Sequence, residues 1–363
     1  MERYSRQIRL PEVGLDGQRR LGEASVLVVG AGGLGSPALT YLAAAGVGRL
    51  GVVDFDRVEA SNLHRQTLYA DDDLGRPKVE ATRERLREVN PEVDVQTYDA
   101  RFGPDNAESI LEGYDLVLDG TDTFATRYLV NDMAVRLGVP NVYASVSRFD
   151  GQASVFAAPG GPCYRCLFPQ PPPPGLVPDC AEGGVLGVLP GLMGTIQATE
   201  ALKLILSIGE PLVGRLLVME SLTMETRTFA VERDPSCPAC GSGAPLPPPP
   251  SPLPMASVPE ITVHDLKARL DGDDVPFVLD VREPDEYEAA NLGGALIPLG
   301  ELPDRIEEIR EHQHAEVVVH CRSGGRSARA VEFLQANGFD QAVNLKGGIH
   351  AWSDEIDPSL PKP

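Results

Sequence analysis

A glycine-rich loop between a strand and a helix is the feature that most narrows what this chain can fold into. The apolar, valine-rich run Ala24–Val29 predicts a buried strand, and Leu34–Ala45 predicts a helix. Between them, Gly30, Gly32 and Gly35 form the pattern G-x-G-x-x-G. Glycines at these positions allow a tight turn and let a phosphate approach the backbone at the helix start. The pattern therefore predicts a nucleotide-binding loop, with a phosphate-free packing turn as the alternative.

Strands and helices alternate through the rest of the first 241 residues. Further strands are expected at 50–53, 116–118 and 141–144, and helices at 77–89, 126–137 and 194–208. This order is typical of a doubly wound, mostly parallel α/β sheet. Residues 258–363 repeat the alternation on a smaller scale, with strands at 277–280 and 317–320. We therefore expect a Rossmann-like α/β domain followed by a small α/β domain.

A proline-rich stretch separates these two parts. Residues 242–257, SGAPLPPPPSPLPMAS, show no hydrophobic periodicity. Such a composition favours extended polyproline without a core. A surface loop inside one domain is the alternative, but structureless loops of this length are uncommon there. We predict a first domain over 1–241, a linker over 242–257 and a second domain over 258–363.

The charge balance excludes some classes of partner. The chain has 53 acidic and 32 basic residues, which gives a net charge of −21. Binding to nucleic acid or to anionic membranes needs a basic surface, so neither is expected. The sequence contains no stretch of about 20 apolar residues, so we expect no membrane span. The start, MERYSRQIRLPEVG, lacks the apolar core of a signal peptide, so we expect a cytoplasmic protein.

Four of the six cysteines form two C-x-x-C pairs. The pairs are Cys163 with Cys166 and Cys237 with Cys240. Six cysteines are too few for a disulfide scaffold, and two such pairs make a tetrahedral thiolate site for structural zinc. Four protein ligands leave no open position for catalysis. Two independent redox pairs are the alternative.

Cys321 is the candidate nucleophile of the second domain. It follows the predicted strand at 317–320 and opens the segment CRSGGRS. Small residues let successive backbone N–H groups turn inward around an anion, and a helix is expected to begin at the far end. Arg322 and Arg326 add positive charge. These features favour a reactive thiolate.

The polar residues after the glycine loop do not fit a dehydrogenase. Asp54 ends the next strand, where it could accept hydrogen bonds from a ribose, and with the glycines alone NAD would be the default ligand. However, Arg6, Arg65 and Lys78 supply several cations. Cations that converge on a nucleotide suit a triphosphate, because they offset the charge of a pyrophosphate leaving group.

The motifs of the first domain resemble those of one enzyme family. RYSRQI, GAGGLG, DFD followed by SNLHRQ, GRPKVE, and DGTD are similar to the adenylyltransferases that activate ubiquitin-like sulfur carriers. These are the molybdopterin-synthase and thiamine-biosynthesis activating enzymes, related to ubiquitin-activating enzymes. The resemblance covers roughly residues 1–241. It implies that ATP is bound by Gly33, Asp54, Ser61, Asn62, Leu63, His64, Arg65, Lys78, Asp122 and Thr123.

The resemblance also implies further roles. Asp122 would hold magnesium together with ATP, as a single carboxylate among waters and phosphates; a helix N-cap is the alternative. Arg6 would be supplied by the neighbouring subunit, which implies a homodimer. Cys180 stands alone in VPDCAEGG, and the family has there a cysteine that attacks the acyl-adenylate or forms an acyl disulfide. A chance loop cysteine is the alternative for Cys180.

The second domain resembles the rhodanese sulfurtransferases. CRSGGRS, VLDVREPDEY at 278–287 and GGIHAW at 347–352 carry the resemblance over roughly 258–354. It implies that Cys321 carries sulfur as a persulfide and that Arg326 contributes to catalysis. Related phosphatases use a loop one residue longer, so we exclude a phosphatase. One departure is the segment NLGGA at 291–295, where rhodaneses usually have a histidine. We expect His264, His320 and His350 to be packing residues.

The two halves together predict a fused adenylyltransferase–sulfurtransferase. Its partner would be a small ubiquitin-like sulfur carrier that ends in Gly-Gly, and its sulfur donor would be thiosulfate or a cysteine desulfurase. The product would serve molybdenum-cofactor, thiamine, tRNA-thiolation or cysteine pathways. One alternative is an activating enzyme that passes the carrier from Cys180 as a thioester, although a separate catalytic-cysteine domain is lacking. The other alternative is a non-catalytic scaffold that senses a nucleotide.

Overall fold

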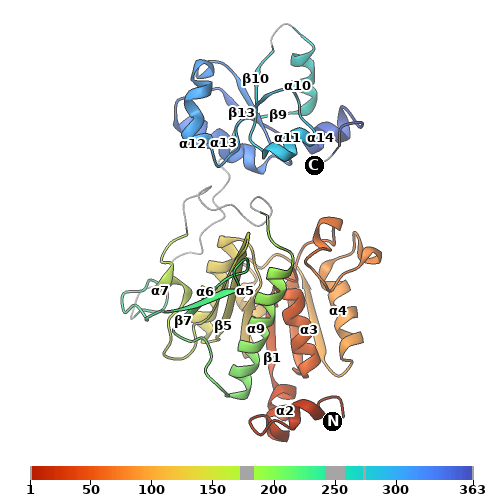
Figure 1. Cartoon of the computed structure of the whole chain (residues 1–363), viewed down its shortest axis with the longest axis vertical. Coiled ribbons are helices and arrows are strands. Elements are labelled where there is room, and N and C mark those ends of the chain that lie inside the picture. The colour runs from red at the N-terminus through yellow and green to blue at the C-terminus, as the bar shows by residue number, and fades with distance from the viewer. Residues whose placement is uncertain (1, 172–183, 242–257, 273–274, 362–363) are drawn as a thin grey trace. The chain divides into compact units, whose positions relative to one another are not determined.

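The chain forms two compact units in the computed structural model (Figure 1). The structure describes residues 2–171, 184–241, 258–272 and 275–361. The first unit contains 2–171 and 184–241, and the second contains the described residues from 258 onward. The predicted linker at 242–257 lies outside the described residues, so the predicted domain boundaries stay predictions.

The first unit is built on a sheet of eight strands. Their order is β3-β2-β1-β4-β5-β6-β7-β8. The first five pair in parallel and the last three pair antiparallel, which confirms the doubly wound α/β prediction for the nucleotide-binding half. The strands are β1 Ser25–Val29, β2 Arg49–Asp54, β3 Asp94–Asp99, β4 Leu116–Asp119, β5 Asn141–Ser147, β6 Asp150–Phe156, β7 Arg215–Glu220 and β8 Glu225–Ala230.

Helices cover both faces of this sheet. Along β1, Val26 and Val28 pack on one face, and Leu27 and Val29 pack on the other, so the strand is buried on both sides. The helices of the first unit are α1 Ser5–Ile8, α2 Gly14–Glu23, α3 Gly35–Ala45, α4 Lys78–Val89, α5 Ala107–Leu111, α6 Phe124–Leu137, α7 Tyr164–Leu167 and α9 Val188–Leu206, with short 3₁₀ turns at Ala60–Asn62 and Asp71–Asp73. Among the described residues, none of the helices is long and apolar enough to cross a membrane.

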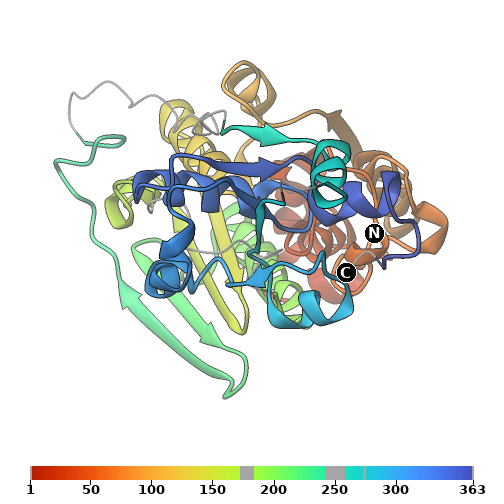
Figure 2. The same cartoon turned by 90° about the horizontal axis from the view of Figure 1, so that it is seen from above.

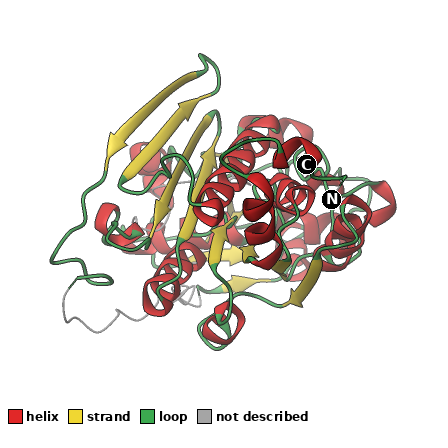
Figure 3. Cartoon of the chain, turned by 90° about the horizontal axis from the view of Figure 1, so that it is seen from below, coloured by secondary structure: helices red, strands yellow, loops and turns green. Residues whose placement is uncertain are grey.

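Two features of this unit differ from the sequence prediction. Helix α9 begins at Val188 instead of Gly194, because Pro190 lies in the first turn, where its missing N–H costs nothing. The antiparallel strands β6, β7 and β8 were not predicted. Strand β8 is exposed along its whole length, and the β7–β8 hairpin extends away from the helices of its unit (Figure 2, Figure 3). A strand without a buried face shows no hydrophobic alternation in its sequence.

The second unit is a five-stranded parallel sheet. Its order is β11-β10-β12-β13-β9, and the predicted strands at 277–280 and 317–320 are confirmed as β10 and β12. The strands are β9 Glu260–Ile261, β10 Phe277–Asp280, β11 Ala295–Leu296, β12 Val317–His320 and β13 Ala342–Leu345. The helices are α10 Val263–Leu270, α11 Pro284–Ala289, α12 Leu302–Arg305, α13 Gly325–Ala336 and α14 Gly348–Glu355, with a 3₁₀ segment at Ile306–His312.

The contact between α3 and α9 gives a stability test with a matched control. A Cβ at Gly194 would overlap the backbone carbonyl oxygen of Leu34, whereas a Cβ at Gly191 would meet nothing within 4 Å. We expect Gly194→Ala to lower the free energy of unfolding by about 1–3 kcal/mol, because the helices must move apart. Gly191→Ala should raise it by up to about 1 kcal/mol through helix propensity. Urea unfolding of the full chain measures both, and equal effects would contradict this packing.

Candidate functional sites

The glycine loop lies where the carboxyl ends of three neighbouring strands meet. The N–H of Gly30 donates to the carbonyl of Val53 at 2.8 Å, and the N–H of Gly120 donates to that of Val29 at 2.9 Å. Gly30 has φ of +96°, and a Cβ there would lie 2.7 Å from the carbonyl oxygen of Gly120. The chain leaves β1 between β2 and β4, which is the topological switch point at which α/β sheets bind ligands.

Asp54 lies beside this loop at the end of β2. Its carboxylate accepts from the N–H of Ala31 at 2.8 Å and from that of Asp56 at 2.9 Å. Burial raises the pKa of Asp54, while the charge of Lys78 opposes that shift. Lys78 begins α4, and its buried Nζ lies 3.0 Å from Oδ2 of Asp56. The structure thus places a carboxylate and an ammonium group at the edge of the predicted nucleotide site.

The segment 61–66 packs against the glycine loop. Asn62 is buried and accepts from the N–H of Glu59 at 3.3 Å. The guanidinium of Arg65 donates to the carbonyl of Ser61 at 2.8 Å and lies 2.9 Å from Nε2 of the exposed His64. Leu63 packs on the core of the unit.

Gly33 has no room for a side chain. A Cβ there would lie 2.9 Å from Cβ of Pro190 and 3.6 Å from Cγ of Arg65. Gly33, Arg65 and the first turn of α9 therefore come together at one place, as the ATP-site prediction requires. The nearby Gln66 is buried, and its Oε1 has no hydrogen-bond partner among the described residues.

The loop after β4 places Asp122 and Thr123 at the same edge of the sheet. The side chain of Thr123 caps α6 by accepting from the N–H of Thr126 at 3.4 Å. The alternative that Asp122 caps this helix is therefore wrong, and Asp122 is exposed. Asp119 is buried and accepts from both the N–H and the hydroxyl of Thr121, at 3.0 and 2.6 Å.

Arg127 forms a hydrogen bond with the backbone of this loop. It is 8% exposed, donates to the carbonyl of Thr121 at 3.2 Å and lies 5.3 Å from the ring centres of Phe124 and Tyr143. The sequence analysis did not single it out, because a lone arginine in a helix is normally exposed. A buried guanidinium thus bonds the backbone of the residue that precedes Asp122.

Arg6 does not join this site within its own chain. It lies exposed in α1, whose neighbour Tyr4 accepts from Nδ2 of Asn90 at 2.8 Å and packs on Gly46 at the end of α3. The glycine loop is at the opposite end of α3, about 16 Å away along an 11-residue helix. Cys180 lies outside the described residues.

The two cysteine pairs come together in space. Sγ of Cys163 lies 3.5 Å from that of Cys237, and Sγ of Cys166 lies 3.4 Å from that of Cys240. All four sulfur atoms lie within 4.8 Å of one another. Four sulfurs bound tetrahedrally to one zinc ion would lie about 3.8 Å apart. Burial raises the pKa of the Cys163 thiol, so a bound cation is needed to keep such a cluster deprotonated. The arrangement fits a metal ion.

The cysteine cluster is attached to α6. The N–H of Tyr164 donates to Oδ1 of Asn131 at 2.7 Å, and Arg165 forms two 2.7 Å hydrogen bonds with the buried carboxylate of Asp132. Helix α6 also carries Arg127 and follows the Asp122 loop. The turn that carries Cys163 and Cys166 and the predicted magnesium ligand are thus connected through one helix.

In the second unit, the thiol of Cys321 lies inside a cradle of donors. The residue is 1% exposed, and its Sγ accepts from the N–H of Gly324 at 3.2 Å and faces the hydroxyl of Ser327 at 3.3 Å. Helix α13 begins at Gly325, so its amino end points toward the sulfur. The prediction of an anion-stabilising loop at this sulfur agrees with this geometry.

The two arginines of the loop differ. Arg326 forms two 2.6 Å contacts with the carboxylate of Glu286 on α11, which fasten the loop to that helix. Arg322 is exposed. The charge of Arg326 is therefore offset by Glu286.

The histidines have different environments. His320 is fully buried 3.5 Å from Asp280, and burial lowers its pKa to about 4, so it packs as a neutral residue. His350 is partly buried. The expectation that His264 is a packing residue is wrong, because its side chain is 66% exposed and pairs with Glu355 on the outer side of α10.

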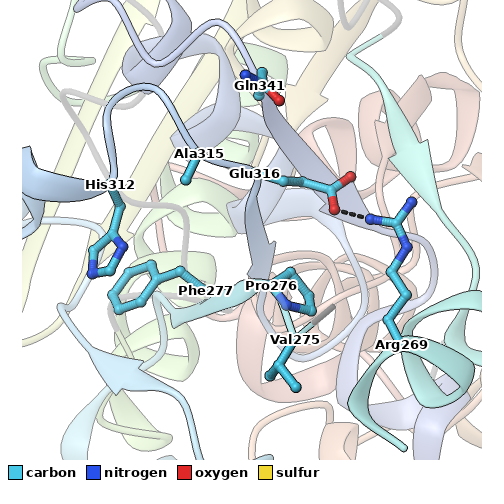
Figure 4. A pocket seen from close by; sticks show the side chains of 8 residues that line it. All are labelled: Arg269, Val275, Pro276, Phe277, His312, Ala315, Glu316 and Gln341. Atoms are coloured by element: carbon cyan, nitrogen blue, oxygen red, sulfur yellow. Dashed lines mark hydrogen bonds and ion pairs between the residues drawn. The ribbon is translucent and has the colours of Figure 1, made fainter. Parts of the chain in front are cut away.

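A pocket of about 710 Å³ lies at the other edge of this unit (Figure 4). Phe277 begins β10, Glu316 precedes β12 and Gln341 precedes β13, so the pocket is at the amino ends of the strands. Its lining includes the stacked rings of Phe277 and His312 and the ion pair of Arg269 with Glu316. Cys321 follows the carboxyl end of β12, so this pocket is separate from the thiol.

Comparison with known proteins finds a match for each of the two units. Residues 4–239 match the ThiF family, and residues 262–355 match the rhodanese-like domain. The probable adenylyltransferase/sulfurtransferase MoeZ of Mycobacterium tuberculosis is 45% identical, over 99% of this chain and 94% of its own length. The sulfur carrier protein adenylyltransferase of Thermus thermophilus is 56% identical, over 66% of this chain and 91% of its own length.

Solved structures support the fold of the first unit. Crystal structures of Escherichia coli MccB align with a TM-score of 0.59 at 23% identity, over 67% of this chain and 73% of that chain. This likeness concerns the fold alone. The matches to both family models and to a relative along the whole chain show its membership: the chain belongs to the ThiF family and to the adenylyltransferase/sulfurtransferases that carry a C-terminal rhodanese-like domain.

Proposed function

We propose that the protein adenylates the C-terminal glycine of a ubiquitin-like sulfur carrier with ATP and then converts it to a thiocarboxylate. One observation carries this proposal. The same chain has a glycine loop at the carboxyl ends of parallel strands, as in nucleotide-binding folds, and a cysteine whose sulfur faces the N–H of Gly324 and the hydroxyl of Ser327. The names of the full-length relatives pair the same two activities. Sulfur from a persulfide on Cys321 would replace one carboxylate oxygen of the carrier.

In the first reaction, a carboxylate oxygen of the carrier attacks the α-phosphorus of ATP, and pyrophosphate leaves. Gly33 lets Pro190 and Arg65 pack against the glycine loop, and Arg65 with Lys78 offsets the charge that develops on the leaving group. Asp122 would hold magnesium, which helps to neutralise the phosphates when it is bound. Arg6 would come from a second copy of the chain, because its own α1 lies at the far end of α3; we therefore propose a homodimer.

In the second reaction, the terminal sulfur of the Cys321 persulfide attacks the acyl carbon and AMP leaves. The product is an acyl disulfide between the carrier and Cys321. A second thiolate, which we assign to Cys180, attacks Sγ of Cys321, so the carrier leaves as a thiocarboxylate. The resulting Cys180–Cys321 disulfide is then reduced by an external thiol. The carrier would end in Gly-Gly, and thiosulfate or a cysteine desulfurase would reload Cys321.

The cysteine cluster would hold one structural zinc ion through Cys163, Cys166, Cys237 and Cys240. The sulfur–sulfur distances support this, and four thiolates complete a tetrahedral shell. The free thiols required here are stable in a reducing compartment, so we place the protein in the cytoplasm. Its thiocarboxylate would supply molybdenum-cofactor, thiamine, tRNA-thiolation or cysteine synthesis.

Pyrophosphate exchange tests the adenylation reaction. With a matching carrier, labelled pyrophosphate should exchange into ATP in the presence of magnesium, and NAD should have no strong effect. Lys78→Ala and Asp122→Ala should lower the exchange rate by orders of magnitude, because these groups meet charge that appears in the transition state. Exposed Asp16→Ala, on α2, is the control. Full exchange in Asp122→Ala would refute its assignment to magnesium.

Metal analysis tests the cysteine cluster. We expect one zinc per chain, and Cys237→Ser should lose the metal and lower the thermal stability of the first unit, because the ion ties 163–166 to 237–240. Cys321→Ser removes a cysteine from the other unit and should keep the zinc. A wild-type protein that contains no zinc and has the same thermal stability as Cys237→Ser would contradict the assignment.

Mass spectrometry of the carrier tests the sulfur transfer. Cys321→Ala should abolish the mass gain that replacement of oxygen by sulfur produces, yet leave pyrophosphate exchange intact. Cys180→Ala should leave both exchange and thiosulfate sulfurtransferase activity intact and reduce only the complete reaction. A thiocarboxylate formed by Cys321→Ala with thiosulfate as the only sulfur source would refute the two-site reaction.

A further inference from the structure

The sulfur of Cys321 shares one hydroxyl group with a second acceptor. The hydroxyl oxygen of Ser327 lies 3.3 Å from Sγ of Cys321 and 2.7 Å from Oδ1 of Asn344. A serine hydroxyl has a single proton, so it donates to one of the two at a time. Ser327 is fully buried and Asn344 is 2% exposed. The thiol and the amide oxygen therefore compete for the same proton.

The neighbouring strand fixes the orientation of Asn344. Asn344 on β13 is paired with Glu260 on β9, and its Nδ2 donates to the Glu260 carboxylate at 3.2 Å. A carboxylate only accepts hydrogen bonds, so the amide nitrogen faces Glu260 and the amide oxygen faces Ser327. The shorter of the two distances from Ser327 is the one to Asn344. In this arrangement the hydroxyl proton belongs to Asn344.

We propose that Asn344 is a positioning residue that controls the hydrogen bond from Ser327 to the sulfur of Cys321. While Cys321 is a neutral thiol, its S–H donates to the Ser327 oxygen and the hydroxyl proton stays with Asn344. When the sulfur becomes negatively charged, the hydroxyl rotates and joins the N–H of Gly324 as a second donor. The inference rests on the proposed role of Cys321 as the sulfur-carrying nucleophile.

Two substitutions of Asn344 should have opposite effects. Asn344→Leu has a similar volume but no acceptor, so the Ser327 hydroxyl is left to the sulfur and the thiolate is favoured. Asn344→Asp keeps the shape but replaces the donor that faces Glu260 with an acceptor and adds negative charge, so the thiolate is disfavoured both through Ser327 and by direct repulsion. Ser327→Ala removes the donor and should lower the thiolate fraction by up to about tenfold, as expected for a hydrogen bond to a charged group. A general loosening of the loop would move all three in one direction.

The thiolate fraction of Cys321 is measurable in the full-length protein at neutral pH. It is the ultraviolet thiolate absorbance of each variant minus that of the same variant with Cys321→Ala, which removes the contribution of the other cysteines. The rate of alkylation of Cys321 by iodoacetamide, followed by peptide mass spectrometry, is the second readout. Thiosulfate sulfurtransferase activity, measured in parallel, tests the proposed function separately.

We expect more thiolate and faster alkylation in Asn344→Leu and the reverse in Asn344→Asp. In a Ser327→Ala background, Asn344→Leu should have no effect, because Asn344 acts through Ser327. Equal shifts in Asn344→Leu and Asn344→Asp, or an undiminished effect of Asn344→Leu without Ser327, would overturn the inference. If Asn344→Leu fails to fold, Asn344→Ala, which also lacks the acceptor and adds no charge, gives the same test with and without Ser327.

Discussion

The backbone contact between the ends of β1 and β4 is the constraint on which the nucleotide site depends. Gly30 and Gly120 approach so closely that a Cβ on either would touch the other's carbonyl oxygen. Gly35 fits against Gly30 in the same way, which brings the start of α3 to the strand ends. Because side chains are absent here, the ends of three parallel strands converge, and Asp54 and Asp122 reach one edge of the sheet.

The second unit uses the same principle with different chemistry. Cys321 follows the carboxyl end of a central parallel strand, and α13 begins four residues later. Backbone N–H groups and a helix end take the place of the glycine loop, and in the proposed function they stabilise a sulfur anion instead of a phosphate. The Glu286–Arg326 pair ties this loop to α11.

The cysteine cluster connects segments that are far apart in the sequence. It ties the α7 turn to the residues that follow β8, and Asn131 and Asp132 attach that turn to α6. Arg127 of the same helix bonds the backbone beside Asp122. Helix α6 therefore contacts both the turn that carries Cys163 and Cys166 and the loop that carries Asp122.

The sequence by itself determined the features that depend on local spacing. The glycine loop, each single C-x-x-C pair and the loop that begins at Cys321 consist of residues within a few positions of one another, so their chemistry is visible in the printed order. The buried, apolar strands β1, β10 and β12 were predicted for the same reason, since burial on both faces leaves a continuous apolar run.

Only the tertiary structure decided which distant polar groups meet. Arg127 is buried because aromatic rings from other elements surround it, and no local pattern marks it. Ser327 and Asn344 meet because α13 packs beside β13, and Glu286 reaches Arg326 across 40 positions of sequence. The exposed strand β8 lacks a pattern because only its pairing with β7 defines it. Such contacts depend on packing between elements, and packing is set by the whole fold and not by any single segment.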